Sequence, residues 1–329
     1  MKAVSLVEAE RLEVVDLPAP EPEPGEVLLR VGACGICGSD LTSYKRGLFI
    51  GVPGHEVAGV VEAVGEAVAG WSPGQAAVLR PGDGCGACDE CRSGSYHRCI
   101  ESLTGSGAVR PGGYAELLAA RADRLQPLAD GLAPEVACLA EPLSVAIHGI
   151  QRVGLAASED AIVLGLGSIG LLATAALRWL GAGRVLGVDP VEVRRELARG
   201  LGAHAVVAGA REVRGEVDGA PLVLECSGRP EAIQQAIDLA SPGGRVALLG
   251  IAVAEVTVIP VFWITREITV TGSINSRFED FDEALRLLVA RPEVAGIVTD
   301  RVALSDVPAT FQALLHPSGM GKVVIDPRK

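Results

Sequence analysis

The sequence predicts an α/β protein of two domains, one rich in β-strands and one built on a doubly wound parallel sheet of six strands. The length of 329 residues exceeds what a single hydrophobic core usually serves. Up to about residue 125, short extended segments alternate with Gly and Pro, whereas from about residue 155 apolar runs alternate with helical segments. Aromatic residues make up only 3% of the chain, so the cores are expected to consist of Ala, Val, Leu and Ile.

The N-terminal domain is expected to contain five extended segments, because each is apolar, short and bounded by Gly or Pro. They are residues 2–7, 26–34, 56–65, 75–79 and 113–120. Residues 18–26 (PAPEPEPGE) are too rich in proline for regular structure, so we expect a stiff surface connection there.

The second domain alternates strands with helices, which indicates a parallel sheet covered on both faces. Six strands are predicted at residues 161–165, 184–189, 203–208, 221–226, 245–250 and 267–272. Helices are predicted at residues 171–181, 191–202, 229–240 and 278–291.

The C-terminal segments 296–304 and 322–326 are strand-like, and their pattern of short extended segments resembles that of the first domain more than that of the second. We therefore expect residues 1–149 with 290–329 to form the first domain and residues 150–289 to form the second. The active site is then expected in the cleft between the two domains.

Composition and charge exclude several classes of partner. The net charge of −12 and the lack of clustered Lys and Arg argue against nucleic acid. Glu8, Glu10 and Arg11 interrupt the apolar core that an export signal needs, so the protein is expected in the cytoplasm. The longest uncharged stretch, residues 161–177, contains several glycines and fits a strand and helix better than a membrane span.

Four of the eight cysteines lie within fifteen residues, in the pattern C-x2-C-x2-C-x7-C: Cys85, Cys88, Cys91 and Cys99. Four thiolates at such spacing can surround one zinc ion as a tetrahedron. Disulfides would require an oxidising compartment, and an iron–sulfur cluster usually has a short last gap followed by Pro, where this chain has Ile100. A closed, structural zinc site is predicted, and the chemistry must lie elsewhere.

A second group of residues that can bind metal lies upstream: Cys37 and Asp40, then His55 and Glu56. Each residue alone is weak evidence, because a single Cys is more often a small apolar core residue and a single His a satisfied polar group. Together they form a mixed Cys, His and carboxylate set, which is typical of a zinc site that keeps one position open.

The segment GLGSIG places Gly165, Gly167 and Gly170, with Ser168 and Ile169 between them, after an apolar strand and at the start of a helix. This context predicts a dinucleotide site, because the glycines allow the pyrophosphate to approach the helix N-terminus. Asp189 follows nineteen residues after Gly170, ends the next strand and can bind ribose hydroxyls, which favours NAD over NADP. Arg194 and Arg195 leave NADP open.

Four segments, in this order, resemble the zinc-containing medium-chain alcohol and polyol dehydrogenases, closest to the sorbitol and threonine dehydrogenase branch. They are CGICGSD (34–40), GHEVAGVVEAVG (54–65), the four-cysteine loop and EPLSVAIH (141–148). The resemblance covers essentially the whole chain. It implies a GroES-like catalytic domain with two zinc ions, one catalytic and one structural, and a Rossmann domain that binds NAD. It also implies a homodimer or homotetramer, in which residues 267–273 could pair across a twofold axis.

By this resemblance Cys37 and His55 are zinc ligands, and Glu56 is a ligand or an exchanging one. Glu141 would hold the water of the zinc ion or exchange with it. Ser39 would hydrogen-bond the substrate oxygen, Asp40 would orient the ligands, and Arg194 would contact the ribose. Many relatives have His where this chain has Thr42, which we expect in the catalytic set. Its hydroxyl can bridge a proton wire but cannot hold the charge near neutral pH, so the proton is expected to leave through Glu141, cofactor ribose and water. Cys34, Cys138 and Cys226 are expected to be core residues.

The predicted function is hydride transfer between a polar secondary alcohol, of polyol or sugar type, and nicotinamide. Cyclitols, aminocyclitols and amino alcohols such as threonine are alternatives, because fold and cofactor do not fix specificity. A zinc-free enone or quinone reductase and an NAD sensor with only structural zinc are rivals. The Cys37 and His55 pair argues against both, since neither needs an open metal site.

Overall fold

The structure is a computed structural model, and it describes residues 1–80, 84–100, 111–129, 131–316 and 319–329. The chain divides into two compact units. One comprises Met1–Glu141, Val298–Ser318 and Lys322–Lys329, and the other comprises Pro142–Ile297 and Gly319–Gly321. Within the described residues, no helix has both the length and the apolar character needed to cross a membrane.

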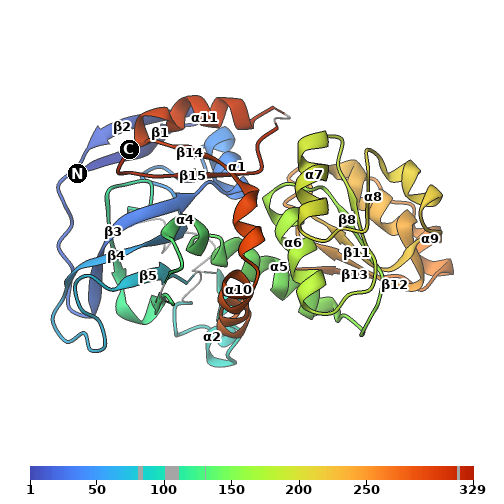
Figure 1. Cartoon of the computed structure of the whole chain (residues 1–329), viewed down its shortest axis with the longest axis horizontal. Helices are drawn as coiled ribbons and strands as arrows, with labels where there is room; N and C mark the ends of the chain where they lie inside the picture. Colours follow the sequence, from blue (N-terminus) through green and yellow to red (C-terminus); the bar gives the residue numbers. More distant parts are fainter. Residues whose placement is uncertain (81–83, 101–110, 130, 317–318) are drawn as a thin grey trace. The chain divides into compact units, whose positions relative to one another are not determined.

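The second unit is centred on a sheet of six parallel strands in the spatial order β10-β9-β8-β11-β12-β13 (Figure 1). The strands are β8 (Ala161–Leu164), β9 (Val185–Val188), β10 (Ala205–Val207), β11 (Ala220–Glu225), β12 (Ala240–Leu248) and β13 (Thr269–Gly272). The chain moves outwards from β8 first in one direction and then, from β11, in the other. This is the doubly wound order, so the predicted six-stranded Rossmann sheet is confirmed.

The helices that precede, join or follow these strands are α5 (Ala140–Val153), α6 (Ser168–Trp179), α7 (Glu192–Gly200), α8 (Pro230–Leu239), α9 (Pro260–Thr265) and α10 (Phe278–Ala290), with 3-10 turns η3 (Ala210–Gly215) and η4 (Pro292–Ile297). Right-handed crossovers place α6 and α7 on one face of the sheet and α8 on the other. Ile237 of α8 packs into a buried core with Ile162, Val223 and Val246 of the sheet. The four predicted helices are present, whereas α5 and α9 were not predicted.

The first unit contains a seven-stranded sheet with the order β14-β15-β3-β4-β5-β7, in which β6 also pairs with β3, and a separate hairpin of β1 and β2. The strands are β1 (Lys2–Glu8), β2 (Arg11–Asp16), β3 (Glu26–Gly35), β4 (Glu56–Val64), β5 (Ala76–Leu79), β6 (Leu117–Arg121), β7 (Leu125–Pro127), β14 (Val298–Val302) and β15 (Lys322–Ile325). Strand β3 is buried at nine of its ten positions, which suits its place in the middle of the sheet.

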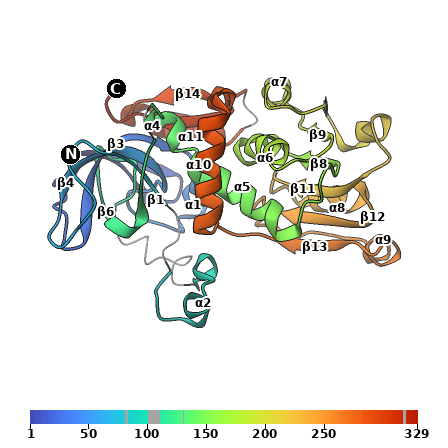
Figure 2. The same ribbon diagram turned by 60° about the horizontal axis from the view of Figure 1, so that its bottom comes forward.

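The short helices described in this unit are α1 (Gly38–Arg46), α2 (Asp89–Arg92), α4 (Pro134–Ala137) and α11 (Val307–Leu314), with 3-10 turns η1 (Tyr96–Arg98), η2 (Ala122–Arg124) and η5 (Leu304–Asp306). Figure 2 shows the loop that carries α2 extending away from the sheet of this unit. The C-terminal strand β15 runs antiparallel to β3, with Val324 opposite Gly35 and Ile325 opposite Cys34. This pairing places the start of β15 beside the end of β3, where the candidate metal site begins.

Candidate metal and cofactor sites

Cys37 lies between the end of β3 and the start of α1. Its backbone is extended, and its N–H donates to Oδ2 of Asp40 at 3.0 Å, so that Asp40 caps the helix. The sharp change from strand to helix therefore fixes the Cys37 thiol and the Asp40 carboxylate relative to each other.

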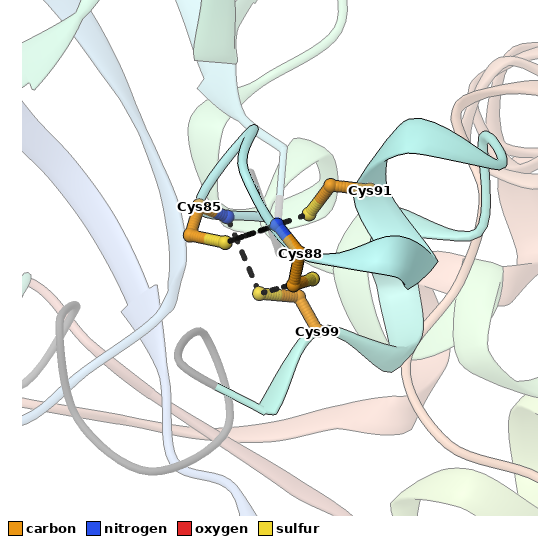
Figure 3. A group of neighbouring side chains, drawn as sticks. All are labelled: Cys85, Cys88, Cys91 and Cys99. Carbon is orange, nitrogen blue, oxygen red and sulfur yellow. Dashed lines mark hydrogen bonds between the residues drawn. The ribbon is translucent and has the colours of Figure 1, made fainter.

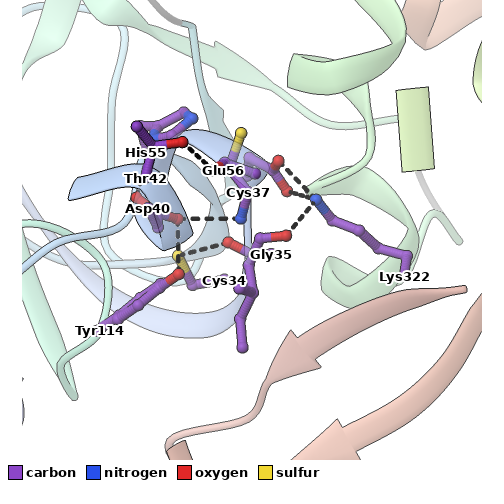
Figure 4. A network of polar contacts seen from close by, with 11 residues as sticks. Cys34, Gly35, Cys37, Asp40, Thr42, His55, Glu56, Tyr114 and Lys322 are labelled. Carbon is purple, nitrogen blue, oxygen red and sulfur yellow. Dashed lines mark hydrogen bonds and ion pairs between the residues drawn. The ribbon is translucent and has the colours of Figure 1, made fainter. Parts of the chain in front are cut away.

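His55 and Glu56 lie where the chain enters β4, the strand that pairs with β3. The ligand atoms of Cys37, His55 and Glu56 all lie within 4.8 Å of one another (Figure 4). A thiol, an imidazole and a carboxylate so close together suit one zinc ion with a position left for another ligand. The structure thus brings together three of the residues that the sequence predicted as catalytic zinc ligands.

Asp40 is held on two sides and faces the imidazole of His55. Its side chain is 7% exposed, and its Oδ1 lies 3.7 Å from Nδ1 of His55. Its Oδ2 accepts a hydrogen bond of 2.7 Å from the buried hydroxyl of Tyr114. Burial and the Asp40 charge raise the pKa of Tyr114, so its hydroxyl remains a donor. Tyr114 was missed by the sequence analysis, which placed it only in an extended segment.

The pKa of His55 is raised well above its usual value. Burial opposes protonation, but the charges of Cys37 and Asp40 outweigh it. The charges of Cys37 and Asp40, which favour a protonated His55, also favour a metal cation at the same place, because the imidazolium and the metal ion are both positively charged. Zinc and protons are therefore expected to compete for this site.

Glu56 is fully buried and forms an ion pair with Lys322, the first residue of β15. Nζ of Lys322 donates to Oε1 of Glu56 at 2.6 Å and to the carbonyl oxygen of Ile36 at 2.9 Å. Burial lowers the pKa of Lys322, but the charges of Glu56 and Cys37 outweigh it and raise the pKa to about 12. A Cβ at Gly35 would lie 1.8 Å from Oε2 of Glu56, so only glycine leaves room for this carboxylate.

Lys322 was missed by the sequence analysis. The segment KVVID was identified only as a strand, and a lysine at the start of a strand is usually exposed. The available signal was weak: a single charge directly before a run of apolar residues that the structure buries completely.

Glu141 is buried near the start of α5, and burial raises its pKa to about 7. The His55 charge opposes this shift, whereas the Glu56 charge adds to it. Its carboxylate does not belong to the group of Cys37, His55 and Glu56, whose ligand atoms lie within 4.8 Å of one another. Whether Glu56 or Glu141 completes the zinc shell stays a prediction.

The two hydroxyl residues of α1 that the sequence predicted as catalytic, Ser39 and Thr42, lie differently. Ser39 lines a cavity of about 210 Å³ together with Asp40, Ser43 and His55. The apolar part of the cavity is lined by Leu6, Leu12, Phe49, Val52 and Phe311. Thr42 instead donates its hydroxyl at 3.2 Å to the carbonyl oxygen of Gly38, one turn earlier in the same helix. Of the two predicted residues, Ser39 is thus the one whose hydroxyl is placed to meet a small polar molecule beside His55.

The four cysteines of the α2 loop converge (Figure 3). Sγ of Cys85 lies 4.0 Å from that of Cys91, and Sγ of Cys88 lies 3.8 Å from that of Cys99. A tetrahedron with zinc–sulfur bonds of about 2.3 Å has edges of about 3.8 Å, so these distances fit zinc. The N–H groups of Ala87 and Cys88 donate to Sγ of Cys85 and lower its pKa to about 7. The chemistry and geometry of this set fit a metal ion that all four thiolates enclose.

The glycine loop follows β8 and leads into α6. Gly165 has a φ of +84°, and a Cβ on it would lie 2.7 Å from Cβ of Ser227. Gly167 precedes α6 in extended conformation, and a Cβ there would have no heavy atom within 4 Å. Ser168, Ile169 and Gly170 form the first turn of the helix. The open space at the N-terminus of a twelve-residue helix fits a pyrophosphate.

Asp189 follows the end of β9 and is 4% exposed. Its Oδ2 accepts from the N–H of Leu166 in the glycine loop, and its Oδ1 accepts from the N–H of Val191, both at 2.8 Å. Nη1 of Arg194 lies 3.8 Å from Oδ2 of Asp189, and Nε of Arg194 donates to the carbonyl oxygen of Met320 at 3.3 Å. Asp189 thus ties the glycine loop to the next strand, and a positive charge lies beside it.

Two family comparisons match large parts of the chain. Residues 23–130 match the alcohol dehydrogenase GroES-like domain, and residues 168–290 match the zinc-binding dehydrogenase family. These matches agree with the two kinds of site described above, a metal site in the first unit and a glycine loop in the second.

Individual relatives match along almost their full length. A 2-dehydro-3-deoxy-L-galactonate 5-dehydrogenase from Pseudoalteromonas atlantica is 33% identical, with 98% of each chain covered. An L-threonine 3-dehydrogenase from Deinococcus deserti is 34% identical, with 99% of each covered. A crystal structure of a zinc-binding dehydrogenase from Sinorhizobium meliloti, bound to NADP, has a TM-score of 0.90 at 32% identity, with 99% of each covered. The chain belongs to the zinc-containing medium-chain alcohol and polyol dehydrogenases.

Proposed function

We propose that this dehydrogenase interconverts a polar secondary alcohol, of polyol or sugar type, and the corresponding ketone with a nicotinamide cofactor. The first unit would be the catalytic domain, with one catalytic and one structural zinc ion, and the second unit would bind the dinucleotide. The observation that carries this proposal is the convergence of Cys37, His55 and Glu56 within 4.8 Å. A protein that only binds nucleotide has no need of such a set.

Cys37 and His55 would hold the catalytic zinc, with Glu56 or Glu141 completing its shell. When bound, zinc supplies Lewis acidity that lowers the pKa of an alcohol, and nicotinamide accepts the hydride. Asp40 faces the imidazole of His55 at 3.7 Å and would orient it, and Tyr114 holds Asp40 through a hydrogen bond. Ser39 lines the cavity beside His55 and is placed to hydrogen-bond the alcohol oxygen. Glu141, with a pKa of about 7, can take up or release a proton near neutral pH.

NAD is the proposed cofactor because a buried carboxylate at Asp189 would repel the 2′-phosphate of NADP. Three observations weaken this preference. Both oxygens of Asp189 already accept backbone hydrogen bonds, and Arg194 lies 3.8 Å away. The Sinorhizobium meliloti relative is bound to NADP. Both cofactors therefore belong in the assay.

A polyol or sugar acid is the first choice of substrate because the Pseudoalteromonas atlantica relative acts on a sugar acid. Threonine is the second choice, since the Deinococcus deserti relative oxidises it. Cyclitols and aminocyclitols share the polar secondary alcohol and remain candidates.

We also propose that the protein is a homodimer or homotetramer in the cytoplasm. Strand β13 lies at the edge of its sheet, and Phe262 and Ile264 of the neighbouring α9 are 45% and 73% exposed. An open strand edge beside exposed apolar residues suits pairing with a second copy. None of the eight cysteines, all of which the structure describes, is joined in a disulfide, and thiolates that are to bind zinc require a reducing compartment.

The test is a panel of polyols, sugar acids, cyclitols and threonine, assayed for NADH and NADPH formation on protein whose zinc content has been measured. We expect about two zinc ions per chain, turnover of at least one polar alcohol, and loss of turnover in Cys37→Ser. Cys138→Ser, a buried cysteine outside the ligand group, is the matched control and should keep its zinc. Nucleotide binding with one zinc ion and no turnover would instead identify a sensor.

A further inference from the structure

A buried carboxylate that the proposed chemistry does not use lies at the end of β11. Glu225 is fully buried. Its Oε1 accepts hydrogen bonds from the N–H groups of Ser227 at 2.7 Å and of Gly228 at 3.1 Å, and also from the Ser227 hydroxyl. One carboxylate therefore holds the turn that follows β11 through at least three donors.

This arrangement is costly for folding. Burial raises the pKa of Glu225, and the donors of Ser227 and Gly228 only partly oppose the shift. An apolar side chain at the end of a buried strand would avoid this cost. What the carboxylate provides in return is the fixed position of the Ser227–Gly228 turn.

The turn lies at the point of the sheet where a ligand is expected. Strands β8 and β11 are neighbours, with Leu164 opposite Glu225, and the chain leaves them in opposite directions. In open α/β sheets, ligands bind at the carboxyl ends of the strands at this switch point. We therefore expect the glycine loop after β8 and the turn after β11 to form the two sides of the cofactor crevice.

The two sides are in direct contact. The N–H of Cys226 donates to the carbonyl oxygen of Leu164 at 2.8 Å. A Cβ on Gly165 would lie 2.8 Å from the backbone N and Cα of Ser227, so the first glycine of the loop packs against the turn. A shift of Ser227 by a fraction of an ångström would therefore move Gly165 or leave a gap beside it.

We propose that Glu225 is a positioning residue for the dinucleotide: its carboxylate holds the Ser227–Gly228 turn, which supports the glycine loop and forms the second wall of the cofactor crevice. This inference rests on the proposed nicotinamide cofactor. Glu225 acts on cofactor binding alone, because both ligand groups for zinc lie in the other unit.

The test measures NADH and NADPH affinity of zinc-loaded protein by fluorescence titration, together with zinc content and thermal unfolding. Glu225→Gln keeps the shape but removes the charge: its carbonyl oxygen can take the place of Oε1 only as a neutral acceptor, and its NH₂ then faces the N–H of Gly228, which lies 3.3 Å from Oε2. We expect a dissociation constant about tenfold higher than in the wild type, about 1.4 kcal/mol, with unchanged zinc content. In steady-state assays the KM for the cofactor should rise while that for the alcohol does not. Glu231→Gln, an exposed acid on α8, is the matched control and should bind as the wild type does.

The outcomes separate the inference from the function on which it rests. Wild-type protein that binds neither cofactor would overturn both. Wild-type binding with equal affinity in Glu225→Gln would overturn the inference alone, even if the variant melts earlier, because a purely structural role lowers stability without changing affinity. If Glu225→Gln does not fold, Ser227→Ala is the variant that tests the inference. It removes the hydroxyl donor to Glu225 and keeps the hydrogen bonds from the backbone N–H groups of residues 227 and 228. Binding about threefold weaker supports the inference, and unchanged binding overturns it.

Discussion

Nζ of Lys322 lies 2.6 Å from Oε1 of Glu56, and both side chains are buried. The two residues are far apart in the chain and meet because β15 pairs with β3 while β3 pairs with β4. A lysine directly behind a candidate zinc ligand can hold the carboxylate away from the metal or release it. The pair therefore links the stability of the first unit to the state of the metal site.

Removing the lysine should leave the Glu56 charge buried without its partner. We expect Lys322→Met to destabilise the protein by about 3–5 kcal/mol, measured as the free energy of unfolding in urea. Glu56→Gln in the same background should recover part of this loss, giving a coupling energy of about 1–3 kcal/mol in the double-mutant cycle. Additive effects of the two changes would show that the pair does not form in solution. Lys2→Met, at an exposed ion pair, is the control and should cost less than about 1 kcal/mol.

The raised pKa of Glu141 sets a direction for the pH dependence of stability. Its pKa rises from 4.5 in the unfolded chain to about 7 in the folded metal-free protein, so the folded state binds more protons between these values. Protonation of Glu141 therefore stabilises the folded state by at most about 3 kcal/mol. This stabilisation is fully present below about pH 4.5 and is lost as the pH rises through 7. Glu141→Gln removes the titration. Metal-free Glu141→Gln should therefore melt higher than the wild type at pH 8, and the difference should shrink towards pH 5. A difference that does not change with pH would contradict this assignment.

The sequence was sufficient for features that depend on local pattern. Six apolar runs separated by helical segments predicted the strands of the second unit, and the C-x2-C-x2-C-x7-C spacing predicted the cluster of thiols. The glycine loop was recognised because strand, turn and helix are consecutive in the chain. In each case the residues that make the feature are close in sequence or repeat with a fixed period.

Other features depend on long-range pairing, which the sequence does not display. Lys322 reaches Glu56 only because β15 joins the sheet beside β3, and Tyr114 reaches Asp40 across 74 positions. The short helix α9 begins at Pro260 after apolar residues that look like a strand, and its apolar side chains are largely exposed. The periodicity of apolar residues could not predict these contacts or the α9 helix, since each depends on residues that are distant in the sequence.

The two candidate metal sites should respond differently to loss of a ligand. Cys88→Ser should remove about one zinc ion per chain and lower the melting temperature, because the α2 loop depends on its metal for structure. Cys37→Ser should abolish turnover and lower the melting temperature less than Cys88→Ser does. The measurement is zinc content by atomic absorption, together with circular dichroism melting and initial rates. Loss of both metals in either variant would show that the sites are not independent.

Asp189 offers a direct test of cofactor choice. Asp189→Asn removes the charge without changing the volume, and we expect the ratio of NADPH to NADH affinity to rise about tenfold or more, because the 2′-phosphate is no longer repelled. The change also has a cost. Both oxygens of Asp189 accept backbone hydrogen bonds, so the amide must direct its NH₂ at the N–H of Leu166 or Val191.

Leaving one of these donors without a partner should weaken the loop by about 1–3 kcal/mol, so NADH affinity should fall in the same variant. Fluorescence titration with both reduced cofactors measures the two effects separately. Arg194→Ala is the complementary variant: it removes the nearby positive charge and should lower NADPH affinity more than NADH affinity. If neither variant changes the ratio, the adenosine end of the cofactor lies away from Asp189, and the basis for preferring NAD is lost.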